Sequence, residues 1–361
     1  MKSVKCIITI LFFAITTLLL AACGGGGSGD EDFRVPTAPA AGVSITADNA
    51  ELISADVLGT VEIISGFSSI GDLLPEPVPG VQVDVTGSEF SYPDFFVQQL
   101  QRLPAALDSQ SGASNVSGVT ISPIIQPCES GSTTISGDVD VFYPDWIPAV
   151  GDLITIRFND CEEAGIVLNG KMSMTITELS PGFDFTPPYT LGLDVVLTLF
   201  SVEAVGGGEV AWTDGDMSMR LSEDGFGYEA LEFWGNSITA WSGSEVETLT
   251  DYQFFYDENS ALPQPAYSYE LEKGKLASTI IGGAVSFQMT KPGTMDQSVP
   301  FEGVDAGDPA AGELWITTAA DTSMAHVTAL PNSIDVSIDV YLDDVIVENI
   351  MTTWDYLWSL L

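Results

Sequence analysis

The sequence predicts an all-β protein, an extended antiparallel meander that forms a sandwich or curls into a half-barrel or barrel, with one or two short helices. Apolar and polar residues alternate over many segments. In residues 333–343, SIDVSIDVYLD, the side chains of Ile334, Val336 and Ile338 fall on one face. Alternation of apolar and polar residues, with one face exposed to solvent, is typical of antiparallel strands. The 361 residues accommodate roughly 14–16 such strands.

The first 22 residues predict a signal peptide. Lys2 and Lys5 precede the apolar run CIITILFFAITTLLL, whose last residue begins Leu20-Ala21-Ala22-Cys23. The run is too short, and has the wrong flanks, for a membrane span. Two readings follow: an ordinary signal peptide with a chance cysteine, or a leader that ends in a lipidated cysteine.

Leu20-Ala21-Ala22-Cys23 resembles the lipobox of bacterial lipoproteins. The resemblance implies that the Cys23 thiol receives diacylglycerol, that a peptidase cuts after Ala22, and that the new amine is acylated. Three acyl chains, palmitate among them, then hold the protein to a membrane. In that family an aspartate after the cysteine retains the protein in the inner membrane. Because Gly24 stands there, we expect an outer-membrane protein whose domain faces the periplasm or the cell surface.

The expected order of domains follows from these boundaries. Residues 1–22 are the signal peptide, and residues 23–42 are a flexible Gly/Ala/Pro tether. An N-terminal β region is expected at 43–125, followed by the main β domain at 126–361. Strand-like alternation is found at 80–87, 133–143 and 151–158.

Cysteine usage predicts one disulfide. Cys6 leaves with the leader and Cys23 carries the lipid, so Cys128 and Cys161 remain. Outside the cytoplasm two such thiols are oxidised by default. Closing a loop of about 34 residues stabilises a fold by about 3–4 kcal/mol in the chain-entropy model.

Two segments have helical character. Residues 94–107, DFFVQQLQRLPAAL, predict two or three turns that end at Pro104. At the C-terminus, residues 354–361 place Trp354, Leu357 and Trp358 on one helical stripe. We expect this second helix to cover an open edge of the core.

A short repeat recurs along the chain. VLNGKMSMTI (167–176) and WTDGDMSMRL (212–221) share a glycine followed by x-Met-Ser-Met, and LEKGKLASTI (271–280) is a degenerate third copy. Asn169-Gly170 and Asp214-Gly215 suit type I′ turns, so the sequence predicts a hairpin at each. The copies are too irregularly spaced for a solenoid or propeller.

From Cys128 onward the chain is similar to uncharacterised β-rich lipoproteins of proteobacteria. The similarity lies in Cys128, in GDLITIRFNDCEEAGIVLNGKMSM (151–174) and in the closing segments AGELWITTAADTSMAHVTAL, SIDVSIDVYLDD and TTW. It implies a β domain that carries a disulfide, and no activity.

The charge excludes one class of partner. Acidic residues outnumber basic ones 51 to 10, which gives a net charge of −41. Such a chain repels phosphate backbones, so we expect no nucleic-acid binding. Adaptation to salt or a requirement for solubility explains the composition, and cations or basic partners would complement it.

The residues needed for common catalytic sites are missing from the sequence. His326 is the only histidine, which rules out a histidine-rich zinc site and a two-histidine mechanism. The mature chain has no G-x-S-x-G elbow, phosphate loop or dinucleotide fingerprint. We therefore predict no catalytic residue, no metal site and no cofactor, and a structural or surface role for His326.

Two alternatives remain open. Paired carboxylates at a cleft would make a glycan hydrolase. Asp339, Asp343, Asp344 and Glu348 offer carboxylate ligands for a weak calcium site, although Tyr341 departs from a calcium-loop pattern; the other reading is a solvated turn.

The function predicted from these observations is that of a non-enzymatic binding or structural module of the envelope, anchored to the outer membrane through Cys23. An apolar ligand or another envelope protein is the expected partner. The alternative is an extracytoplasmic hydrolase of the glycan type. A deep apolar cavity or an exposed apolar sheet face would favour binding, and two convergent acids about 5–10 Å apart would favour hydrolysis.

Overall fold

The fold is described from a computed structural model. The residues that it describes are 34–65, 95–100, 103, 116–141, 148–163, 165–180, 187–207, 210–262, 266–294, 298–304 and 308–361. The contacts divide the chain into Met1–Arg34 and Val35–Leu361, and the helices and strands that the structure describes belong to the second unit. The signal peptide, Cys23 and the strand expected at 80–87 lie outside the described residues.

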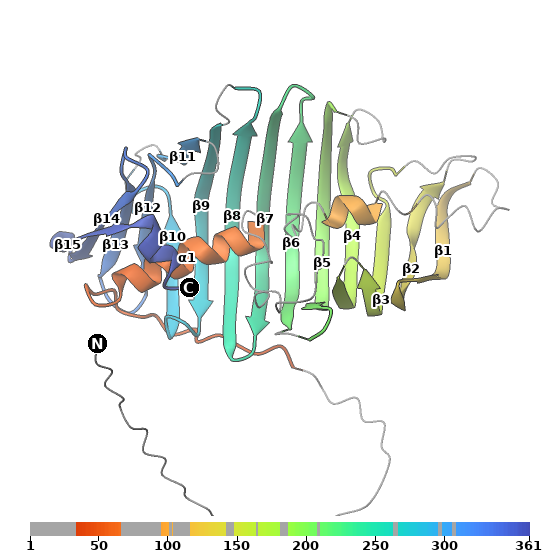
Figure 1. The fold of residues 1–361 in the computed structure, drawn as a ribbon, viewed down its shortest axis with the longest axis horizontal. Helices are drawn as coiled ribbons and strands as arrows, with labels where there is room; N and C mark the ends of the chain where they lie inside the picture. The colour runs from red at the N-terminus through yellow and green to blue at the C-terminus, as the bar shows by residue number, and fades with distance from the viewer. Residues whose placement is uncertain are drawn as a thin grey trace, which may run out of the picture. The chain divides into compact units, whose positions relative to one another are not determined.

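The prediction of an all-β meander is confirmed (Figure 1). The described residues form one 15-stranded sheet in which pairing is antiparallel and follows the chain order, except that β11 pairs with β9. The sheet does not close, so a closed barrel is not formed. The strands are β1 (Val116–Pro127), β2 (Ser130–Val141), β3 (Leu153–Glu163), β4 (Ile166–Ser180), β5 (Tyr189–Ala204), β6 (Ala211–Glu223), β7 (Tyr228–Ser242), β8 (Glu245–Asn259), β9 (Ala266–Ser278), β10 (Gly283–Gln288), β11 (Phe301–Val304), β12 (Glu313–Thr317), β13 (Met324–Ala329), β14 (Asp335–Leu342) and β15 (Val345–Thr353).

Helix α1 (Ala50–Ser65) lies within the region 43–125, which was expected to be β. Figure 1 shows it across one face of the sheet, and it contacts α4 and strands β9, β13 and β14. Ile53 and Val57, one helical turn apart, are buried. The helix contains several β-branched residues, which suit strands and mask the helical pattern in the sequence.

Both helical predictions agree with the described residues. Residues 95–100 are helical; Pro104 lies outside the described part. Helix α4 (Trp354–Trp358) begins after Thr353, whose side chain accepts a hydrogen bond from the N–H of Tyr356. Trp354 and Leu357 are fully buried, so this helix covers part of the core as expected.

The core lies on one face of the sheet, the face that carries the helices. Alternate residues of each strand point into it, including Met172 and Met174 of β4 and Met217 and Met219 of β6. The residues between them point away from the core, and we call that side the outer face. On the outer face most side chains are half-buried or exposed.

The two Asn/Asp-Gly pairs do not form hairpin turns, which corrects the prediction. Asn169-Gly170 lies inside β4 and Asp214-Gly215 lies inside β6. Each pair opposes a β-bulge in the preceding strand, where Asp160 and Leu199 have φ angles of 46° and 44°. An Asn-Gly dipeptide has the same local preferences at a bulge as at a turn, so the dipeptide alone does not separate the two.

The side chain before each glycine stabilises the bulge that it faces. Asn169 Oδ1 accepts a hydrogen bond from the backbone N–H of Asp160 at 2.8 Å. Asp214 Oδ1 accepts one from the N–H of Leu199 at 2.9 Å. A bulge leaves a backbone donor without its place in the ladder, and these oxygens satisfy it.

The third copy keeps the bulge and loses the acceptor. Gly274 lies opposite a bulge that contains Asp251, whose φ angle is 51°. Lys273 precedes the glycine and offers no acceptor. Lys275 instead forms an ion pair with Asp251 at 3.2 Å. The repeat is therefore a bulge motif that occurs three times across the sheet.

Gly170→Ala should destabilise the protein by about 2 kcal/mol or more. The φ angle of Gly170 is +94°, and a Cβ there would overlap the carbonyl group of Leu199. Gly151→Ala is the matched control, because Gly151 has a similar φ of +99° and no atom within 4 Å of the added Cβ. Urea unfolding of both variants measures their free energies of unfolding. Both lose stability because alanine disfavours a positive φ, and only Gly170→Ala adds the overlap with Leu199. Equal losses of stability in the two variants would contradict the close contact between Gly170 and the bulge at Leu199.

Candidate functional site

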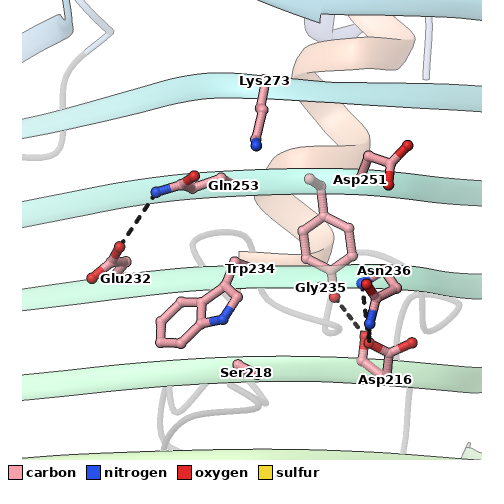
Figure 2. Close-up of a pocket in the computed structure, with 10 residues that line it drawn as sticks. Asp216, Ser218, Glu232, Trp234, Gly235, Asn236, Asp251, Gln253 and Lys273 are labelled. Carbon is pink, nitrogen blue, oxygen red and sulfur yellow. Dashed lines mark hydrogen bonds between the residues drawn. The ribbon is translucent and has the colours of Figure 1, made fainter.

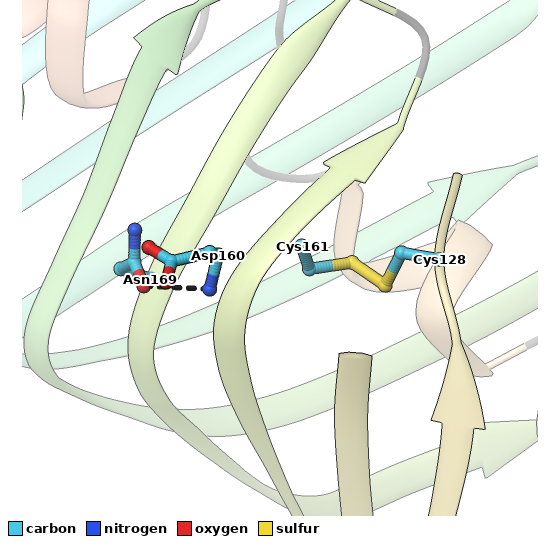
Figure 3. Close-up of a disulfide and its surroundings, with 4 residues drawn as sticks. All are labelled: Cys128, Asp160, Cys161 and Asn169. Carbon is cyan, nitrogen blue, oxygen red and sulfur yellow. Dashed lines mark hydrogen bonds between the residues drawn. A yellow bond between two sulfur atoms is a disulfide. The ribbon is translucent and has the colours of Figure 1, made fainter. Parts of the chain in front are cut away.

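The predicted disulfide is present (Figure 3). Cys128 follows β1 and Cys161 lies in β3, with their Cα atoms 5.4 Å apart. Cys161 is fully buried. Glu163 lies near both sulfur atoms, but sulfur atoms joined in a disulfide do not act as thiolate ligands. The pair is a structural cross-link between strands.

A pocket of about 550 Å³ opens on the outer face, over β6 to β9 (Figure 2). Core side chains and helices lie on the opposite side of these strands. Four strands build the pocket, so residues 57 positions apart in the sequence line one surface. Its lining residues are Asp216, Ser218, Glu232, Trp234, Gly235, Asn236, Asp251, Tyr252, Gln253 and Lys273.

Trp234 is the large apolar group of the pocket. It pairs across the sheet with Ser218 of β6 and Gln253 of β8. Its exposed fraction is 36%, which is high for a tryptophan in a central strand. The indole therefore presents apolar surface to solvent between polar neighbours.

Tyr252 supports the pocket from below. Its ring is buried, and its hydroxyl donates to the backbone carbonyl of Asp216 at 2.9 Å. Burial, with a contribution from the charge of Asp216, raises the pKa of Tyr252, so the phenol stays neutral and remains a donor. The Tyr252 ring occupies the position that a Cβ on Gly235 would take. Gly235 is thus required for this packing.

Each carboxylate of the pocket already has a donor. Asp216 accepts hydrogen bonds from the backbone N–H of Asn236 at 3.0 Å and from its side-chain amide at 2.9 Å. Glu232 accepts one from the Gln253 amide at 3.4 Å. Asp251 is paired with Lys275, as described above. Through these contacts the three acids link neighbouring strands of the sheet.

The only histidine lies elsewhere. His326 of β13 stacks on Trp315 with ring centroids 4.0 Å apart, and its Nε2 lies 3.0 Å from Glu313 Oε2. Its side chain is 14% exposed. Lys291 Nζ lies 5.3 Å from the Trp315 ring centre, on which it makes a cation–π contact. His326 is absent from the residues that line the pocket, and its contacts are those of a packed structural side chain.

The acidic residues considered for calcium are spread over a turn and two strands. Asp343 and Asp344 connect β14 to β15 with φ angles of 52° and 61°, the geometry of a type I′ turn. Asp343 accepts from the Thr322 hydroxyl at 2.7 Å and Asp339 from the Asn349 amide at 2.6 Å. Among the described residues these carboxylates do not gather into a group of three. The solvated turn is the reading that this geometry supports.

The pocket residues did not stand out in the sequence. Asp216 and Ser218 lie in the repeat, but their meeting with Trp234 and Lys273 depends on the register of four strands. The one available signal was a tryptophan at an outward position of an alternating strand.

Comparisons with protein-family models, with curated proteins and with solved structures found no match. None of the helices that the structure describes has the length and apolar character to cross a bilayer.

Proposed function

We propose that this chain is a non-enzymatic binding module of the bacterial envelope, held at the outer membrane through Cys23, with the outer-face pocket as its ligand site. The observation that carries the proposal is the exposed Trp234 within a pocket whose other lining groups are polar. Ligand sites combine apolar contact with precisely placed polar groups, and this pocket offers one aromatic face among a larger number of polar groups. Because this lining is polar, the proposed ligand is polar and not the apolar one expected from the sequence.

The state of the carboxylates favours binding over hydrolysis. A glycan hydrolase needs one acid that gives up a proton and a second that acts as base or nucleophile. In the pocket the carboxylates of Asp216, Glu232 and Asp251 hold the bulges and neighbouring strands together. Such groups can also accept hydrogen bonds from a ligand, since each oxygen has more than one acceptor site.

Capture of envelope material tests the binding proposal. The mature wild-type protein, extracted from membranes under native conditions, should retain a ligand that mass spectrometry detects. Trp234→Ala should lose it. Phe226→Ala is the matched control, because Phe226 is an aromatic residue with 82% exposure that does not line the pocket. Equal retention by both variants would argue against the pocket, and turnover of a glycan that Glu232→Gln abolishes would favour the hydrolase.

Metabolic labelling tests the anchor. Cys23→Ser should leave an uncleaved precursor that takes up no palmitate, because the serine hydroxyl does not replace the thiol in the lipid transfer. Cys6→Ser, within the leader, should be processed and labelled as the wild type is. Cleavage of the Cys23→Ser protein together with its recovery in outer-membrane fractions would contradict the lipoprotein proposal.

A further inference from the structure

A row of side chains crosses the outer face at the level of the pocket. The strand register pairs each member with the next, from β5 to β10. Neighbouring strands lie about 4.8 Å apart, so a polar or aromatic group recurs at that interval on both sides of the tryptophan. The row consists of Asp194, Ser218, Trp234, Gln253, Lys273 and Gln288.

Donors and acceptors are mixed along this row. Asp194 accepts from the Ser218 hydroxyl at 2.6 Å, which leaves further acceptor sites on the carboxylate. Gln253 and Gln288 each carry a donor and an acceptor. Figure 2 shows Lys273 extending from β9 toward the strands that carry the other lining residues. A ligand beside this row therefore meets both kinds of group at short intervals.

Acidic residues outnumber basic ones less strongly at the pocket than in the whole chain. The chain has only 10 basic residues against 51 acidic ones. Lys273 lines the pocket, Lys275 pairs with Asp251, and Arg220 pairs with Glu178 at 2.8 Å on the same face. Lys273 and Lys275 offset part of the charge of Asp216, Glu232 and Asp251, whereas Arg220 is matched by Glu178. The remaining negative charge disfavours an anionic ligand, and Lys273 within the lining disfavours a strongly cationic one.

The size and the polar lining of the pocket favour a sugar over an apolar chain as the ligand. An apolar chain would leave the polar lining groups unsatisfied. A sugar ring has an apolar C–H face that packs against an indole, and hydroxyl groups that both donate and accept. A volume of about 550 Å³ lies within the usual range for ligand sites and admits more than one ring.

We propose that the pocket binds a neutral pyranose oligosaccharide, with Trp234 packed against one ring and the row from Asp194 to Gln288 bonding to the hydroxyl groups of successive rings. This inference rests on the proposed binding function and names its ligand class. The strand interval is similar to the length of one sugar ring along a chain, so consecutive rings reach consecutive strands.

Titration calorimetry on the mature full chain tests the ligand class. The probes are neutral hexasaccharides of glucose, of N-acetylglucosamine and of mannose, each with its monosaccharide. We expect at least one hexasaccharide to bind and its monosaccharide to bind at least about tenfold more weakly, because the monosaccharide contacts only one position of the row. Spermidine and a phosphorylated glucose oligosaccharide report on cationic and anionic alternatives.

Variants then locate the site. Trp234→Ala should weaken hexasaccharide binding by about tenfold or more. Phe226→Ala should leave it unchanged. Gln253→Ala, a smaller change in the same row, should weaken hexasaccharide binding by several-fold. This second variant still tests the site if Trp234→Ala fails to fold. Binding that is insensitive to both pocket variants would overturn the assignment of the site.

The outcomes separate the ligand class from the function. If no hexasaccharide binds while the membrane-extracted wild type still retains a ligand that Trp234→Ala loses, the saccharide inference fails and the binding function stands. Tighter binding of spermidine or of the phosphorylated oligosaccharide would likewise overturn the neutral-saccharide inference. If the protein binds no hexasaccharide and the membrane-extracted wild type also retains no ligand, the saccharide inference and the proposed function both fail.

Discussion

Replacing Cys128 with alanine should lower the free energy of unfolding by about 3–4 kcal/mol. The disulfide joins residues 33 positions apart and closes a loop that contains β2 and most of β3. Without it the unfolded chain gains the conformational freedom of that loop. The native state also keeps a Cys161 thiol fully buried without its covalent partner.

Urea unfolding with and without a reducing agent measures this effect. The reduced wild-type protein should unfold at nearly the urea concentration of the Cys128→Ala protein, and the reducing agent should leave the variant unchanged. The double variant Cys128→Ala, Cys161→Ala should resemble the single variant, because both remove the same cross-link. Two free thiols in denatured, unreduced mature protein would refute the pairing.

Replacing Asp56 with asparagine should stabilise the protein at pH 7–8 by up to about 3 kcal/mol. Asp56 of α1 is fully buried. Desolvation raises its pKa from 3.8 to about 6, against the lowering effect of hydrogen bonds with Ser278 and Glu247, and the charge of Glu245 raises it further. The folded protein therefore favours the protonated carboxyl, whereas the unfolded chain ionises it near pH 3.8.

The sign of the pH dependence follows from these pKa values. The contribution of Asp56 to stability is fully present below pH 3.8 and is lost as the pH rises through about 6. Asparagine stays neutral and can still donate to Glu247, so the variant should lack the decline in stability that Asp56 causes between pH 4 and 7. Thermal unfolding across this range measures it.

Asp48→Asn is the control for this experiment. Asp48 lies just before α1 and is exposed, so its replacement should change stability by no more than about 0.5 kcal/mol. The measured quantity is the difference in unfolding free energy between the wild type and Asp56→Asn. If this difference stays constant from pH 4 to 8, Asp56 is not a buried carboxyl that stays protonated in the folded protein.

Several features of the fold were predictable because they depend on local chemistry. Alternation over 333–343 predicted a strand, and Val336, Ile338 and Val340 of β14 are buried as expected. The stripe of Trp354 and Leu357 predicted α4. The disulfide followed from counting the thiols that remain after the leader.

Other features were mispredicted where one local signal fits two structures. Asn169-Gly170 suits a hairpin turn and also a bulge, and only the continuation of β4 on both sides, paired to β3 and β5, identifies the bulge. Helix α1 was missed for a similar reason. Its residues gain their stability from burial of Ile53 and Val57 against the sheet, which no local propensity reports.

The sequence by itself determined the class of the fold, the cross-link between Cys128 and Cys161, and the side of β14 that faces the core. The tertiary structure alone decided which outward side chains meet. Trp234, Gln253 and Lys273 become neighbours because three strands pair in one register, and a shift by one residue would turn each strand's side chains to the opposite face. That register results from packing over the whole sheet, so the pocket exists only once the core beneath it has formed.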